Sequence, residues 1–202
     1  MKEGLNIIVA GVGGQGILSL ARVLGEAAVL EGLEALVAET HGLSQRGGSV
    51  IVHVRIGENI EAPLIPVGEA DIMISMEAME TLRSIGYMRR GGVIVSDTLI
   101  IPPSIPGVKP LKLEDIVGAI KSAGLEAHFI SASEEAKRLG DFRTANIVLL
   151  GYAYKVSKIK DLISLHSLMK AVETLPGRDL NLKALTLYAT PDANLERARG
   201  WV

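Results

Sequence analysis

The chain has 202 residues, enough for one well-buried α/β domain. Its 48% hydrophobic and 22% charged residues, with a net charge of −2, give no general attraction to nucleic acid or acidic lipid. With no cysteine, the chain cannot form disulfides or supply thiolate ligands, and its four histidines are not spaced as metal ligands. We therefore expect no metal site and no nucleic-acid partner.

Apolar patterning predicts alternating strands and helices along most of the chain. The predicted strands are 5–10, 35–39, 50–56, 72–76, 93–96 and 127–131. The predicted helices are 17–32, 78–89, 113–123 and 133–139, followed by a mainly helical segment from Thr144 that breaks near Pro176–Gly177 and Pro191. The first apolar run is too short to span a membrane and leads directly into glycines, so we expect a cytoplasmic chain without membrane contact.

This alternation predicts a Rossmann-like, three-layer α/β fold with a mostly parallel sheet. We expect one domain over residues 1–202, with the sheet and its covering helices in about 1–140 and a helical C-terminal extension packed on it in about 141–202. Residues 50–56 alternate between apolar and polar side chains, with His53 and Arg55 on the polar face. That alternation predicts a half-exposed edge strand, antiparallel or at the rim of the sheet.

A glycine-rich turn, GVGGQG, lies between the first strand and the first helix. Small residues there permit a tight turn and let a phosphate approach amide groups at the positive end of the helix. Three readings stay open: a dinucleotide site with Glu39 as the ribose-binding acid, an anion site such as one for a coenzyme A phosphate, or simple packing of the helix on the sheet. The candidate residues are Gly11, Gly13, Gly14, Gln15 and Gly16.

A second polar passage, HGLSQRGGSV, follows the second strand. In a parallel sheet its start shares a rim with the glycine turn, so we expect its polar groups to face that turn. A guanidinium is suited to phosphate or carboxylate, because it donates two parallel hydrogen bonds. The candidate ligand- or substrate-proximal residues are Ser44, Gln45, Arg46, Gly47 and Gly48, and the candidate partner contacts are His41, His53 and Arg55.

Two long stretches, VAGVGGQGILSLARVLGEAAVLEG and ETHGLSQRGGSVIVHVRIG, resemble the gamma-type domain family of 2-oxoacid:ferredoxin oxidoreductases. Within it they resemble the small-subunit branch that acts on indolepyruvate. The segments EADIMISMEAMETLR, GGVIVSDT, RTANIVLLGYA and NLKALTLYA agree, so the resemblance runs from about Asn6 to Ala189. Its most specific part is HGLSQRGGSV.

The resemblance implies an accessory subunit of a two-subunit enzyme that converts aryl 2-oxoacids to aryl-acetyl-coenzyme A with ferredoxin as electron acceptor. Thiamine diphosphate, Mg and iron–sulfur clusters are then expected in the large (alpha) subunit, with coenzyme A as co-substrate, ferredoxin bound through the complex, and no catalytic residue in this chain. The alternatives are the gamma subunit of an enzyme for pyruvate, 2-oxoisovalerate or 2-oxoglutarate, or a free-standing dinucleotide-binding protein.

We predict that Arg46→Ala leaves the isolated subunit folded but weakens complex formation or oxoacid turnover about thirtyfold or more. Truncating one side of a desolvated charged contact costs roughly 2–5 kcal/mol. Binding of the variant to its partner and steady-state turnover measure the effect. Wild-type assembly together with wild-type kinetics would reduce Arg46 to an ordinary surface arginine.

Overall fold

The structure is a computed structural model and describes residues 4–41, 48–102, 109–190 and 192–193. Its strands are β1 (Leu5–Val12), β2 (Glu34–His41), β3 (Ser49–Gly57), β4 (Ala70–Ser75), β5 (Met88–Asp97) and β6 (Glu126–Ile130). Its helices are α1 (Ile17–Leu30), α2 (Ala78–Ser84), α3 (Leu113–Ser122), α4 (Ala132–Leu139), α5 (Ala145–Val156), α6 (Ile159–Leu162), α7 (Leu165–Val172) and α8 (Arg178–Ala189), with short 3-10 turns at Ile85–Tyr87 (η1) and Phe142–Thr144 (η2).

The strands form one six-stranded sheet in the order β2-β3-β1-β4-β5-β6. The pairs β1–β4, β4–β5 and β5–β6 are parallel, whereas β3 runs antiparallel to both β1 and β2. Strand β2 therefore points the same way as β1, and their carboxyl ends lie at the same rim. This confirms the predicted α/β fold with a mostly parallel sheet.

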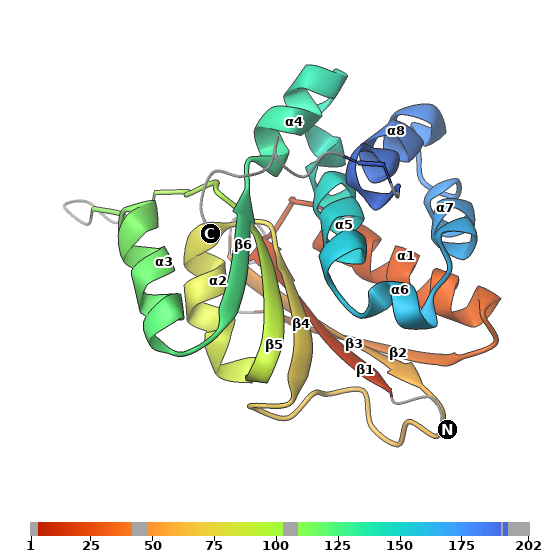
Figure 1. The fold of residues 1–202 in the computed structure, drawn as a ribbon, viewed down its shortest axis with the longest axis horizontal. Coiled ribbons are helices and arrows are strands. Elements are labelled where there is room, and N and C mark those ends of the chain that lie inside the picture. The colour runs from red at the N-terminus through yellow and green to blue at the C-terminus, as the bar shows by residue number, and fades with distance from the viewer. Residues whose placement is uncertain (1–3, 42–47, 103–108, 191, 194–202) are drawn as a thin grey trace.

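Helices cover both faces of the sheet, which gives three layers (Figure 1). On β1, Ile7 and Val9 join a core with α1 and α5–α8, while Ile8 and Ala10 join a second core with α2 and α3. Burial on both faces explains why this strand is a continuous apolar run and does not alternate. No helix in the described ranges is both long and apolar enough to cross a bilayer.

The third strand is antiparallel, which was one of its two predicted alternatives, but its predicted edge position is wrong, because β3 lies between β2 and β1. Its polar face is not open either: His53 is only 2% exposed, and its Nδ1 accepts a hydrogen bond from the Ile65 N–H at 3.2 Å. Arg55 donates to Asn6 Oδ1 at 3.0 Å and to the Ala62 carbonyl at 2.7 Å. The polar residues of β3 thus bind the loop between β3 and β4. The edge strand at this end of the sheet is β2.

Two helix boundaries also differ from the predictions. The helix expected over 78–89 ends at Ser84, and β5 already begins at Met88 after the 3-10 turn. The helical segment after Thr144 breaks at Ser157 and again around Ile163, as well as near Pro176. Hydrophobic spacing does not mark these breaks, because the residues on either side of them pack into one core.

Helix α5 is buried on all sides, and Gly151 makes its close contact with α8 possible. A Cβ at Gly151 would lie 2.3 Å from the Leu185 carbonyl oxygen, which is backbone and cannot rotate away. The first turn of α5 lines the site described below, so this glycine sets the position of that turn.

We predict that Gly151→Ala destabilises the chain by about 1–3 kcal/mol or more, because the new methyl overpacks a backbone contact. Gly118→Ala is the matched control: Gly118 is an exposed residue of α3 whose Cβ would meet nothing within 4 Å. That variant should gain roughly 0.5–1 kcal/mol from helix propensity. Urea unfolding of both variants measures the difference, and equal stabilities would contradict the packing assigned to Gly151.

Candidate functional site

The glycine turn joins β1 to α1 at the carboxyl rim of the sheet. Its glycines are required for different reasons, some by backbone conformation and some by close packing. Gly14 and Gly16 have φ of 102° and 76°, the left-handed region that favours glycine. A Cβ at Gly11 would lie within 3.0 Å of Ile17 and Met76, and one at Gly16 would lie 2.6 Å from the Asn146 amide nitrogen. Packing within the chain therefore accounts for Gly11 and Gly16, whereas a Cβ at Gly14 would meet nothing within 4 Å.

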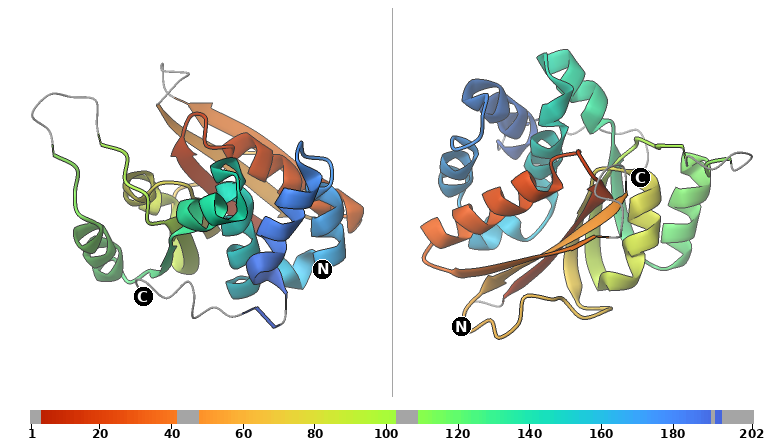
Figure 2. Two further views of the ribbon diagram at one scale, coloured as in Figure 1. Left: turned by 90° about the horizontal axis from the view of Figure 1, so that it is seen from above. Right: turned by 180° about the vertical axis from the view of Figure 1, so that it is seen from behind.

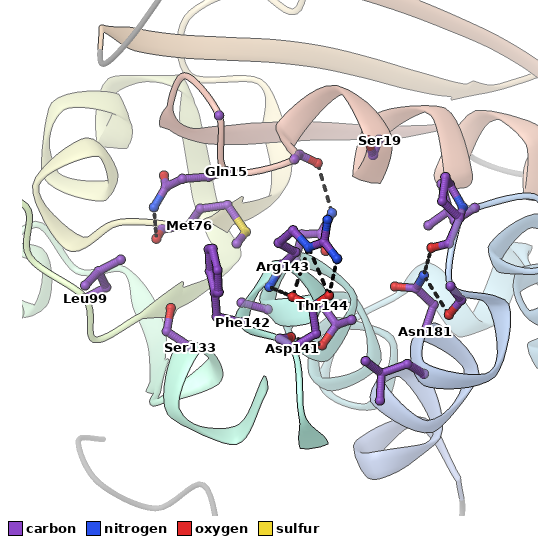
Figure 3. A pocket seen from close by; sticks show the side chains of 18 residues that line it. Gln15, Ser19, Met76, Leu99, Ser133, Asp141, Phe142, Arg143, Thr144 and Asn181 are labelled. Atoms are coloured by element: carbon purple, nitrogen blue, oxygen red, sulfur yellow. Dashed lines mark hydrogen bonds and ion pairs between the residues drawn. The ribbon is translucent and has the colours of Figure 1, made fainter. Parts of the chain in front are cut away.

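The Gln15 side chain ties the turn to the neighbouring strand end. Its Oε1 accepts the Val12 N–H at 2.7 Å, and its Nε2 donates to the Met76 carbonyl at 3.1 Å. Met76 directly follows β4, so one amide joins the carboxyl ends of β1 and β4 (Figure 3). These two bonds explain Gln15 without a ligand, and its place among the predicted ligand residues remains an untested prediction.

The polar passage returns to the glycine turn at its end. The Gly13 N–H donates to the Gly48 carbonyl at 2.9 Å. One residue on, the Ser49 hydroxyl donates to Glu80 Oε2, a carboxylate only 2% exposed that also pairs with Arg83. This places Gly48 beside the turn, and its role as a candidate ligand residue stays a prediction. Ser44, Gln45, Arg46 and Gly47 lie outside the described residues, and His41 is described only as the last residue of β2, paired with Val50.

The other two predicted partner contacts, His53 and Arg55, are bonded to residues of this chain. His53 is buried, its ring lies edge-on to Tyr87 with 5.3 Å between centroids, and its Nε2 has no hydrogen-bond partner among the described residues. Burial lowers the pKa of the His53 imidazole, so this side chain is neutral near pH 7. A role for His53 as a surface contact is therefore wrong, and Arg55 is already bonded to Asn6 and Ala62.

A cleft of about 520 Å³ opens above the glycine turn (Figure 3). Residues at and just before the starts of three helices line it: Gly14, Gln15, Gly16 and Ser19 at α1, Thr144–Asn146 at α5, and Gly177, Leu180 and Asn181 at α8. The Asn146 amide donates to the Gly16 carbonyl at 3.0 Å, which fixes the first two helix starts against each other. Because the first N–H groups of a helix have no acceptor within it, the cleft has the polarity of an anion site.

Charged and aromatic groups stand at the rim of this cleft. Arg143 forms a two-pronged ion pair with Asp141, through Nε to Oδ1 at 3.0 Å and Nη2 to Oδ2 at 2.6 Å. The guanidinium lowers the pKa of the Asp141 carboxyl, and the carboxylate raises the pKa of Arg143. Between them Phe142 is 65% exposed, an unusual position for one of only two phenylalanines in the chain.

Two buried carboxyls that sequence reasoning missed hold the crossing segment after β5. Glu77 accepts the N–H groups of Glu80 at 2.7 Å and Ile101 at 2.8 Å, and Asp97 accepts those of Ser133 at 2.9 Å and Leu99 at 3.3 Å. Burial raises the pKa of both carboxyls, against the effect of these hydrogen bonds. The available signal was an acid directly after each of the predicted strands 72–76 and 93–96.

This topology does not support a dinucleotide site, because the candidate ribose-binding acid, Glu39, is not next to the glycine turn. Glu39 lies on β2, and β3 separates β2 from β1. Two inter-strand spacings amount to about 10 Å, whereas the ribose-binding acid of a dinucleotide fold ends the strand beside the glycine turn. Within the described part of the chain, no three His, Asp or Glu side chains are grouped as metal ligands.

The fold and the rim define an α/β domain with a glycine-turn cleft. Residues 6–187 match the family described as pyruvate ferredoxin/flavodoxin oxidoreductase, and the chain belongs to that family. It is 39% identical to the indolepyruvate oxidoreductase subunit IorB of Archaeoglobus fulgidus over 91% of this chain and 92% of that one.

Two solved structures share the fold. The gamma subunit of a keto/oxoacid ferredoxin oxidoreductase from Geobacter sulfurreducens superposes with a TM-score of 0.68 at 22% identity, over 92% of this chain and 96% of that one. A 2-oxoglutarate:ferredoxin oxidoreductase from Magnetococcus marinus, with 2-oxoglutarate, coenzyme A and succinyl-CoA bound, also gives 0.68 at 23% identity. The match covers 92% of this chain but only 30% of that longer chain.

Proposed function

We propose that this chain is the small subunit of an indolepyruvate:ferredoxin oxidoreductase that forms aryl-acetyl-coenzyme A from aryl 2-oxoacids. The observation that supports it best is 39% identity, along nearly the whole chain, to a subunit named for indolepyruvate. Thiamine diphosphate, with its Mg ion, supplies the decarboxylation chemistry in such an enzyme, and iron–sulfur clusters carry the electrons to ferredoxin. A chain without cysteine offers no thiolates for the clusters, so the proposal assigns all three groups to the large subunit.

Two observations distinguish this proposal from a free-standing dinucleotide-binding protein. Glu39 is two strands away from the glycine turn, and Gln15 uses its amide to join strand ends. A substrate other than an aryl 2-oxoacid remains the alternative, and comparison of kcat/KM values decides it.

We predict that the isolated chain is inert and that the complex with its large subunit reduces ferredoxin or methyl viologen with indolepyruvate and coenzyme A. The comparison uses indolepyruvate, phenylpyruvate, pyruvate, 2-oxoisovalerate and 2-oxoglutarate. The aryl substrates should have the highest kcat/KM. Turnover by the isolated chain would contradict the subunit assignment, and a preference for 2-oxoglutarate or pyruvate would contradict the substrate assignment.

We further propose that the cleft at the three helix starts receives the phosphate-bearing part of coenzyme A. The positive ends of three helices line the cleft and favour an anion, and Nη1 of Arg143 has no hydrogen-bond partner among the described residues. The exposed ring of Phe142 beside it offers a flat surface on which a base can stack. No residue of this cleft is required to react, so its contribution is to bind and orient the co-substrate.

We predict that Arg143→Ala raises the KM of the complex for coenzyme A about tenfold, the equivalent of one charge-assisted hydrogen bond. The loss also leaves the Asp141 carboxylate unpaired beside the incoming phosphates. Arg138→Ala is the matched control, because Arg138 is an equally exposed arginine, ion-paired to Glu135 on α4, that does not line the cleft. Equal KM values for the two variants would contradict the proposal that coenzyme A binds in this cleft.

A further inference from the structure

The two edges of the sheet are protected very differently. Strand β6 has five residues, and two of them, Glu126 and His128, are polar and bonded to each other at 2.9 Å. Strand β2 has eight residues and pairs with β3 without a break, from Glu34 opposite Gly57 to His41 opposite Val50. The two edges therefore present unequal lengths of backbone to a neighbouring molecule.

An edge strand leaves the N–H and C=O groups of alternate residues without partners, and proteins protect such edges with short strands, charges, prolines or bulges. Strand β2 carries two exposed glutamates, Glu34 and Glu39, but it is long and contains neither a proline nor a bulge. Between the two glutamates, residues 35–38 read ALVA, and the whole strand stays in unbroken register with β3. A regular apolar edge of this length is a template for another strand.

The surroundings of β2 leave room for that strand. Ala35 and Val37 face α1, where a Cβ at Gly25 would lie 3.8 and 3.6 Å from them, yet Val37 remains 45% exposed. On the opposite face Leu36 and Ala38 are half-buried, and the core under α2 and α3 includes no residue of β2. Figure 2 shows α2 and α3 over the other end of this face, beside β4–β6 and away from β2.

We propose that the free edge of β2 receives an extended segment of the large subunit, which continues the sheet across the subunit interface. This rests on the proposed function. In the Magnetococcus marinus enzyme the matching domain is 30% of a longer chain, so there the equivalent domain is accompanied by further polypeptide. The edge also ends, at His41, at the rim that carries the glycine turn and the cleft.

Charge selects the large subunit over a second copy of this chain. The exposed carboxylates of Glu34 and Glu39 flank the apolar centre, and β2 has no lysine or arginine. Two copies paired edge to edge would bring four carboxylates along one ribbon without a compensating charge, and like charges opposite each other destabilise a strand pair. The complementary segment has an apolar centre and basic flanks.

Hydrogen–deuterium exchange on the isolated chain and on the complex tests this proposal. About half of the β2 amides point outward. In the complex these amides gain acceptors, so their exchange should slow by about tenfold or more. The β6 amides should not change and serve as the internal control. Unchanged exchange in β2 within an active complex overturns this inference while the proposed function stands. Failure to form any complex overturns both.

Two variants separate strand pairing from simple proximity. Val37→Lys places a charge on the edge, and Val29→Lys places one on the outer side of α1, where the native valine is 62% exposed. We expect Val37→Lys to weaken complex formation about tenfold or more, with the circular dichroism and melting temperature of the isolated chain preserved. Val29→Lys should bind normally. Equal binding of both variants, or a stable dimer of the isolated chain held through β2, overturns the proposal.

Discussion

The Gln15 amide, which joins the ends of β1 and β4, is the contact on which the arrangement of the rim depends. It accepts the last amide of β1 and donates to the carbonyl that follows β4. With those ends fixed, the glycine turn has one position, and Gly16 then docks against Asn146 at the start of α5. Leaving such a partly buried donor without its acceptor costs about 1–3 kcal/mol, so the amide is not easily replaced.

The antiparallel strand β3 has two consequences. It separates β2 from β1, which removes Glu39 from the glycine turn and with it the geometry of a dinucleotide site. It also leaves β2 as a long open edge beside the same rim. A domain whose glycine turn is held by contacts within the chain, and whose edge strand is long and regular, is suited to act as part of a larger assembly, in agreement with its family.

Much of the fold could be predicted from the sequence, because β1, β4 and the second half of β5 are largely buried and mainly apolar. The interior position of β3 could not, because its alternating polar residues suggested an exposed face, whereas His53 and Arg55 bond to Ile65 and Ala62 of a loop. The glycine turn was identifiable from its spacing. The cleft above it was not, because Asn146 and Gly177 come from segments more than a hundred residues away.

The most direct measurement is the composition of the complex purified through a tag on this chain from cells that express both subunits. The account predicts one larger polypeptide in fixed ratio to this chain, with thiamine diphosphate and iron both bound to that polypeptide. Purification of the chain alone, or with a partner that contains neither thiamine diphosphate nor iron, would contradict it.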